Sequence, residues 1–120
     1  MLLLTCLSMI AKGESAIAIG DYSSAHGNGA ISQGEWATSK GNNAQAISNH
    51  AIAEGDRSLA DGLYAHASGE NAIAKGESAR ASGDFSYAKG TDAVADGDHS
   101  VALGEGSRSV GHHSKATGKK

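Results

Sequence analysis

The chain has 120 residues, a formal net charge of −3 and 39% hydrophobic residues. Leu, Ile, Val and Phe together supply only 18 of the 120 residues, which is below the roughly 20% at which a compact core becomes doubtful. The balanced charge gives no nucleic-acid footprint, and Cys6 alone can form neither an internal disulfide nor a zinc site. The chain is therefore expected to be disordered, a repetitive solenoid, or an oligomer that shares a core.

Residues 1–6 open an apolar stretch, MLLLTCLSMI, that has no Lys or Arg before its first Leu. A mainly apolar stretch of ten residues is too short to cross a bilayer as a helix. We interpret residues 1–6 as an atypical N-terminal segment of the domain rather than a signal peptide, and expect no direct membrane insertion.

Glycine recurs every seven residues from position 13 to position 118, and Ser48 takes the one missing place. Fifteen of the 17 glycines lie on this grid, and only Gly29 and Gly106 do not. The chain thus divides into sixteen heptads over residues 7–118, each ending at a grid position, followed by a basic tail at 119–120. A fixed period of this kind decides the fold before any local signal does.

Heptad positions 3 and 5 hold Ala or Ser in 31 of 32 cases, with Met9 as the exception. A coiled coil needs large apolar residues three and four apart, whereas small residues two apart indicate strand alternation. We therefore predict a short strand at positions 3–6 of each heptad, and a turn at the glycine and positions 1 and 2. The glycine is expected to supply the positive φ of that turn. Two strands per coil make a thin all-β roll of eight 14-residue coils, with a very narrow interior.

Position 4 points outward and differs between alternate heptads. One set is mostly polar: Ile10, Ser24, Thr38, Ile52, His66, Arg80, Val94 and Arg108. The other set is mostly apolar, with Gln45 and Lys115 as its polar members, and predicts a homotrimer interface at Ile17, Ile31, Leu59, Ile73, Tyr87 and Val101. Three copies around an axis would share the core that one chain lacks.

Aromatic side chains recur at position 2 of the polar set, 14 residues apart. This column is predicted to form one ladder of rings and is the candidate ligand-contact site: Tyr22, Trp36, His50 and Tyr64. Stacked rings that only stabilise the coils are the alternative. His99 and His113 are expected to stack in the same way, as a surface ladder rather than a metal site. In the apolar set, a column of acidic and amide residues at position 1 predicts a solvated turn edge, relieved by Arg57 or by cations.

The phrases SAIAIGDYS at 15–23 and HSVALGEGS at 99–107 resemble the YadA-type head repeat of trimeric autotransporter adhesins, a seven-residue haemagglutinin repeat. The resemblance covers about residues 7–118. It implies a left-handed parallel β-roll, a homotrimer, and a surface-displayed head that binds host extracellular matrix. The residues that match the collagen-linked phrase of the family are Ser100, Val101, Ala102, Gly104 and Ser107, with His99 and Leu103 replacing its Asn and Ile. The repeat fold itself also requires these residue types at these positions.

The sequence thus predicts a non-catalytic binding head of a trimeric bacterial surface adhesin, in the outer membrane when part of the full-length protein. No catalytic motif, cofactor site or metal site is predicted, because serine recurs as a small residue and no histidine has a ligand spacing. Expected partners are a host matrix protein such as collagen or fibronectin, or a glycan. The alternative is a structural or receptor-binding segment of a phage tail fibre. Ice binding is disfavoured, because a regular outward array of Thr is missing.

Overall fold

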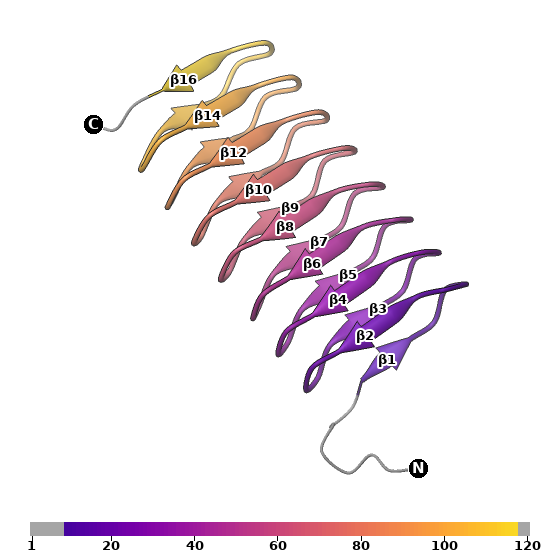
Figure 1. The fold of residues 1–120 in the computed structure, drawn as a ribbon. Coiled ribbons are helices and arrows are strands. Elements are labelled where there is room, and N and C mark those ends of the chain that lie inside the picture. The colour runs from indigo at the N-terminus through magenta and orange to yellow at the C-terminus, as the bar shows by residue number, and fades with distance from the viewer. Residues whose placement is uncertain (1–8, 118–120) are drawn as a thin grey trace.

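The computed structural model describes residues 9–117, so the predicted segments 1–6 and 119–120, the outer limits of the heptad array, and Cys6 lie outside the described part. Sixteen short strands and the turns between them form eight stacked coils (Figure 1). All pairings are parallel, and each strand pairs with the strand 14 residues away. The principal-axis extents are 50 × 24 × 11 Å. The predicted all-β parallel roll of 14-residue coils is confirmed.

The strands divide into two parallel sheets of eight, which we call the odd sheet and the even sheet. The odd sheet contains β1 Ile10–Ala11, β3 Ser24–Ala25, β5 Thr38–Ser39, β7 Ile52–Ala53, β9 His66–Ala67, β11 Arg80–Ala81, β13 Val94–Ala95 and β15 Arg108–Ser109. The even sheet contains β2 Ile17–Ile19, β4 Ile31–Gln33, β6 Gln45–Ile47, β8 Leu59–Asp61, β10 Ile73–Lys75, β12 Tyr87–Lys89, β14 Val101–Leu103 and β16 Lys115–Thr117. We call the turns that leave the even strands corner 1 and those that leave the odd strands corner 2.

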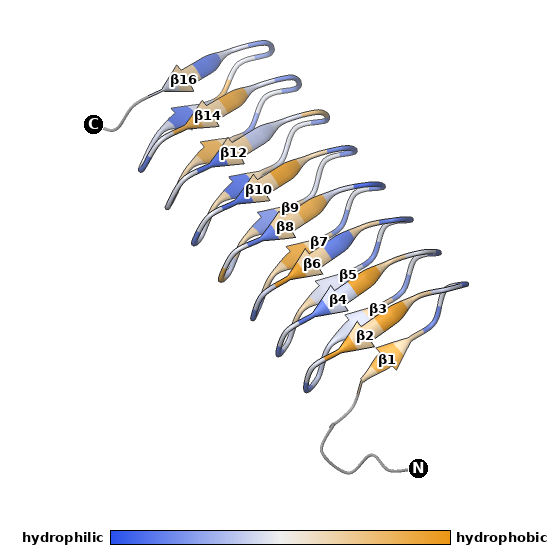
Figure 2. Ribbon diagram, viewed as in Figure 1, coloured by the Kyte–Doolittle hydropathy of each residue, from blue (hydrophilic) through white to orange (hydrophobic). Residues whose placement is uncertain are grey.

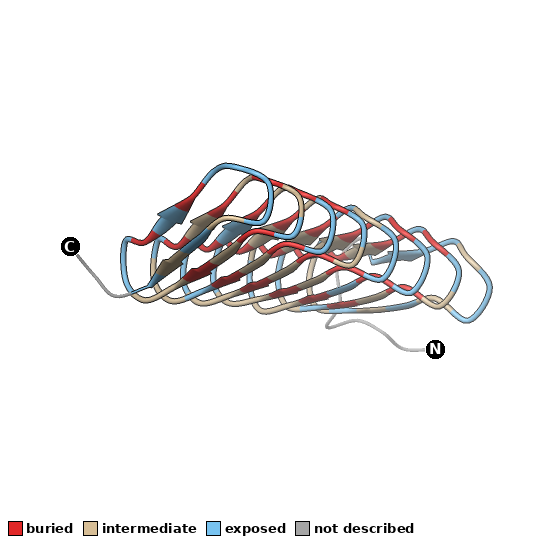
Figure 3. Ribbon diagram, turned by 90° about the horizontal axis from the view of Figure 1, so that it is seen from above, coloured by how far each residue is buried: buried red, intermediate tan, exposed pale blue. Residues whose placement is uncertain are grey.

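Over residues 9–117, the interior between the sheets holds only small side chains. The core cluster consists of alanines alone, and the other fully buried side chains are serines. Burial runs along the inner faces of both sheets in Figure 3. Met9, the one large residue at position 3, lies in the first coil and is 40% exposed rather than packed inside. Within the stacked coils, the inward assignment of positions 3 and 5 is confirmed.

The turns all follow one pattern, in which the position 3 amide donates to the carbonyl of the preceding grid glycine, as Ala16 N does to Gly13 O at 3.1 Å. The position 2 residue is left-handed, with φ near +60° at Ser15 and Asn71. This combination is the signature of a type II turn. It also explains the two glycines outside the grid, since Gly29 and Gly106 both occupy position 2, with φ of 70° and 69°.

The grid glycines differ in backbone conformation between the two corners. At corner 1, glycines such as Gly20 and Gly34 have φ of 117°, as the sequence predicted. At corner 2, glycines such as Gly13 and Gly27 have no positive φ, so that expectation is wrong there. A Cβ on Gly13 would instead lie 2.3 Å from the carbonyl oxygen of Gly27 in the next coil. At corner 1 a Cβ on Gly20 would likewise lie 2.6 Å from the carbonyl oxygen of Gly34. Backbone therefore packs directly on backbone at the grid position of both corners, and a side chain does not fit there.

Ser48 is the one side chain placed on the corner 1 grid, and its φ is 103°. The hydrogen bonds that join this turn to the next coil are long: 3.3 Å from Gly62 N to Ile47 O and 3.2 Å from Tyr64 N to Asn49 O. The equivalent bond from Gly34 N to Ile19 O is 2.9 Å. The Ser48 side chain therefore strains its own backbone and holds two coils slightly apart.

Replacing Ser48 with glycine is expected to stabilise the roll by about 1 kcal/mol, because relief of the positive φ and of the crowded contact outweighs the added chain entropy. Calorimetry would show a rise in Tm of about 4 °C. Ser39→Gly is the matched control, because Ser39 is buried and has no positive φ. This control should lower Tm. A lower Tm for Ser48→Gly as well would contradict the interpretation that the Ser48 side chain strains its turn.

Ala74→Leu is expected to destabilise the roll by about 1–3 kcal/mol, because overpacking a filled interior displaces its neighbours. Ala74 is fully buried and pairs in register with Ala60 and Ala88. Thermal unfolding followed by circular dichroism measures the change. Arg80→Leu places the same side chain on the exposed outer face of the odd sheet and should melt with the parent. An Ala74→Leu variant that also melted with the parent would mean that the interior is wider than described.

Candidate functional site

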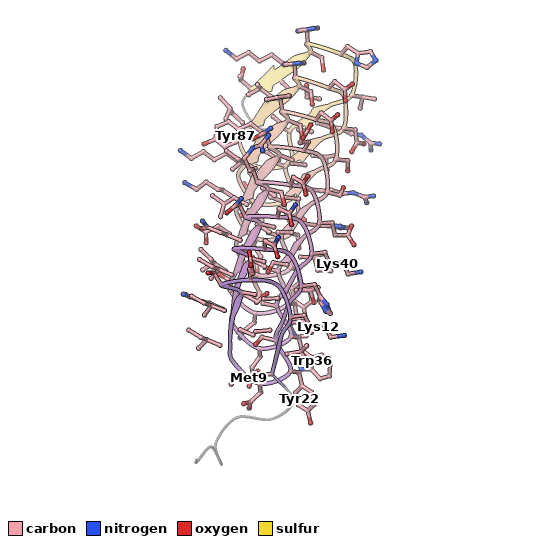
Figure 4. All side chains as sticks on the ribbon, turned by 90° about the vertical axis from the view of Figure 1, so that its right-hand side faces the viewer. Met9, Lys12, Tyr22, Trp36, Lys40 and Tyr87 are labelled. Atoms are coloured by element: carbon pink, nitrogen blue, oxygen red, sulfur yellow. The ribbon has the colours of Figure 1, made fainter. Side chains whose placement is uncertain are left out.

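A column of stacked rings runs along corner 1 at the N-terminal half of the rod. The ring centroids of Tyr22 and Trp36 are 4.4 Å apart, and the two rings lie side by side in Figure 4. The next steps are 6.3 Å from Trp36 to His50 and 4.8 Å from His50 to Tyr64, with interplanar angles of 9°. The structure therefore brings all four residues of the candidate ligand-contact ladder into one continuous column.

The backbone conformation at these four residues is unfavourable for aromatic side chains. Their φ angles are 63° at Tyr22, 65° at Trp36, and 64° at His50 and Tyr64. Bulky side chains rarely take this left-handed conformation, which suits Gly and Asn. Stacking contributes about 0.5–1.5 kcal/mol per pair and offsets part of that cost. The aromatic residues thus occur here against the local backbone preference, and their stacking offsets part of its cost.

Stacking also decides which part of the rings can meet a partner. Faces inside the column are covered by the neighbouring rings, so the rod presents ring edges and the hydroxyls of Tyr22 and Tyr64. Tyr64 is 58% exposed and is followed in the column by Ser78, which has no ring. Its face on that side is not covered by another ring. The column can therefore make edge contacts along its length and a face contact at Tyr64.

A second column of rings lies on corner 2 in the C-terminal half. Phe85 and His99 are 5.0 Å apart and His99 and His113 are 4.9 Å apart, each pair within 4° of parallel. The 14-residue spacing predicted the histidine pair, and the structure shows it. Phe85 was missed, although the same spacing places it directly before His99.

The side chains of the polar column at position 1 of corner 2 accept hydrogen bonds from backbone amides. Asn42 Oδ1 accepts from Asn28 N at 3.1 Å, and Asp56 Oδ1 accepts from Asn42 N at 3.0 Å. Asp84 and Asp98 repeat the arrangement one coil apart at 3.0 Å. Arg57 reaches Glu70 at 3.7 Å, as the sequence analysis suggested. Each of these short side chains therefore caps the turn of the preceding coil.

The residues that match the collagen-linked phrase lie in and beside β14, and their positions are explained by the fold. Ser100 and Ala102 are fully buried, and Val101 is half-buried on the outer face. Gly104 has a φ of 105°, and Ser107 Oγ donates to its carbonyl at 2.9 Å. The Ser100 hydroxyl has no hydrogen-bond partner among the described residues. These residues build the roll, and only Val101 offers a sizeable outer surface.

The predicted interface residues form a straight apolar column along the outer face of the even sheet. The register pairs Ile17 with Ile31, Leu59 with Ile73, and Tyr87 with Val101. Figure 2 shows apolar colour along β2, β4, β8, β10 and β14, interrupted at β6, β12 and β16. Ile17 is 46% exposed in the single chain, and the other five are half-buried. A single chain thus leaves part of this apolar column exposed to solvent.

Over residues 9–117 the structure contains no pocket and no group of three or more potential metal ligands. Within the same range no helix has the length and apolar character needed to span a bilayer. The surfaces available for contact are the two outer sheet faces and the two corners.

Comparisons with known proteins agree with the repeat and the fold. The family described as YadA head domain repeat matches residues 11–34, 53–76, 67–88 and 81–107, which is more than half of the chain. A solved structure, the collagen-binding domain of the Yersinia adhesin YadA, is similar at a TM-score of 0.55 and 23% identity. The match covers 81% of this chain and 68% of that one. No curated protein matches. The chain belongs to the YadA head domain repeat family.

Proposed function

We propose that this chain is the trimeric binding head of a bacterial surface adhesin that attaches to host extracellular matrix proteins. The observation that carries the proposal is the repeat itself, since more than half of the chain matches a family of adhesin heads. The structurally similar Yersinia domain is described as collagen-binding, which supports a matrix protein of that class as the ligand. Under this proposal the head is displayed at the cell surface, in the outer membrane when part of the full-length protein.

The distribution of apolar side chains supports trimer assembly. Inside the roll the core cluster is alanine only, while the Ile, Leu and Val side chains of the even sheet lie outside it. Burial of a Leu or Ile side chain contributes about 1.5–3 kcal/mol, and a single chain forgoes the share of it that belongs to the surface left exposed. Three copies that meet through the even sheet would recover it, and closed threefold symmetry would prevent endless stacking.

The corner 1 column supports contact with a protein ligand. Exposed aromatic side chains are enriched among residues that dominate binding energy at protein interfaces. The rings here are held rigidly by their neighbours, so they lose little conformational entropy on binding. Because most ring faces are already stacked, the column suits the side chains and backbone of a protein better than the flat face of a sugar ring.

Ile73→Asp is expected to dissociate the trimer, because it places three carboxylates near one axis without partners. An unpaired buried charge costs about 3–5 kcal/mol, and mutual repulsion adds to this cost. Sedimentation velocity of the purified chain beside the parent measures the outcome.

Arg80→Asp on the odd sheet is the matched control. It is exposed, and it changes the charge by more than Ile73→Asp does, so it should leave assembly intact. Loss of the trimer by Arg80→Asp and not by Ile73→Asp would show that the odd sheet is the interface. A monomeric parent would contradict the trimer altogether.

Asparagine substitution of Tyr22, Trp36 and Tyr64 together is expected to weaken binding to the matrix ligand more than tenfold, because a hot-spot aromatic contributes about 2 kcal/mol or more. Asparagine suits the left-handed backbone, so the roll should be retained. The measurement is a binding panel of the parent and variant on immobilised collagen, fibronectin and laminin.

Phe85→Asn removes a ring from the same backbone conformation on the other corner and should leave binding within about twofold. Equal loss by this control would place the ligand elsewhere. A parent that binds none of the three matrix proteins would overturn the proposed function itself.

A further inference from the structure

The acidic and basic side chains occupy different parts of the rod. Most acidic residues lie in the turns, at positions 1 and 2: Glu14, Asp21, Glu35, Asp56, Glu70, Glu77, Asp84, Asp92, Asp98 and Glu105. Most basic residues lie on the outer sheet faces, at positions 4 and 6: Lys12, Lys40, Lys75, Arg80, Lys89, Arg108 and Lys115. The net charge of −3 therefore conceals acidic corners and basic faces.

The two kinds of charge also differ in how far the protein itself satisfies them. Several acidic side chains accept backbone amides across coils, as Asp56, Asp84 and Asp98 do. Among the face cations, only Lys40 has an ion pair within residues 9–117, at 3.9 Å from Glu54. These acidic side chains are hydrogen-bonded within the turns, whereas most of the face cations remain available to an external anion.

The odd sheet carries more of the face cations than the even sheet does, and the ion-paired Lys40 is one of them. Lys12 and Lys40 extend from the same side of the rod in Figure 4. Farther along the same sheet, Arg80 and Arg108 flank Val94 in register. Members of each pair are two coils apart, which is about 10 Å at the usual strand spacing. All four side chains are exposed. The charges thus follow the rod axis over most of its length.

Side chains between these cations are mainly hydrogen-bonding groups. Ser24 and Thr38 lie at position 4, and Ser68 and Ser82 lie at position 6 of the same face. Glu54 and Asp96 are the acidic residues on the face. Large apolar side chains are few, whereas a protein interface normally centres on a buried aromatic or apolar cluster. This surface suits a hydrated, polyanionic ligand better than a second protein.

We propose that the outer face of the odd sheet binds a linear sulfated polysaccharide that lies along the rod axis. Arg and Lys form strong charge-assisted hydrogen bonds with oxyanions, and the serine and threonine hydroxyls can bond to sugar hydroxyls. Nucleic acid is a poorer fit, because single strands are bound by aromatic stacking and this face has no ring other than histidine. The surface is separate from corner 1, so the proposal goes beyond matrix-protein binding and does not depend on it.

The test divides the Lys and Arg residues of positions 9–117 into two matched sets of four. The face variant carries Lys12→Gln, Lys40→Gln, Arg80→Gln and Arg108→Gln. The control variant carries Arg57→Gln, Lys75→Gln, Lys89→Gln and Lys115→Gln, with the same net charge. Affinity of each full chain for immobilised heparin is measured by surface plasmon resonance at several salt concentrations, with circular dichroism to confirm the fold.

We expect the parent to bind heparin and the face variant to bind at least about tenfold more weakly, with a shallower salt dependence, because fewer counterions are released. The control variant should bind within about threefold of the parent. Equal losses by both variants, or no binding by the parent at physiological salt, would overturn the proposal. So would equal displacement by a DNA duplex of matched charge. If the face variant still binds collagen or fibronectin, this surface and the matrix-binding site are independent of each other.

Discussion

Direct contact between the backbones of successive coils is the constraint on which the rest of this structure depends. Parallel strands in adjacent coils lie about 4.8 Å apart, and the turns must keep the same spacing. A Cβ on the corner 2 glycine Gly41 would lie 2.3 Å from the carbonyl oxygen of Gly55. A side chain is therefore excluded from the grid position of each corner, and the seven-residue glycine grid follows. The lengthened bonds beside Ser48 show what one exception costs.

The same constraint makes the roll too thin for an ordinary core. With tight corners and two-to-three-residue strands, the interior admits Ala and Ser, and the larger apolar side chains lie outside. The stability of one coil then depends on its neighbours, through backbone ladders, Asx capping and ring stacks. Because each residue contacts its counterpart 14 residues away, chemically similar groups form columns. A column of rings stabilises the roll by stacking. A column of carboxylates destabilises it by repulsion, unless backbone amides donate hydrogen bonds to the carboxylates.

The sequence was sufficient to predict the fold because the period specifies which residues become neighbours. Pairing of Ile73 with Leu59 and Tyr87, burial of Ala74, and stacking of His99 on His113 all follow from a 14-residue coil. It could not reveal why Gly13 and Gly27 are needed without a positive φ, because that reason lies in the distance between two backbones. It also did not show that Asp84 and Asp98 cap the turns, because the rotamer of a short side chain has no periodic signal. The ligand-contact role of the corner 1 rings stays a prediction.

Charge illustrates the limit of composition most clearly. A net charge of −3 on 120 residues gave no reason to expect a polyanionic partner. Net charge, however, averages over surfaces that a rod-shaped molecule keeps apart. Turns favour Asp and Asn because these side chains cap backbone amides, whereas the outer positions of strands tolerate long Lys and Arg side chains. Local structural preference alone thus sorts the acids to the corners and the bases to the faces. In a repetitive fold this sorting recurs along the rod, so a weak preference per residue becomes a row of cations, interrupted on the odd sheet by Glu54 and Asp96. The binding properties of such a rod depend on that pattern rather than on its sum.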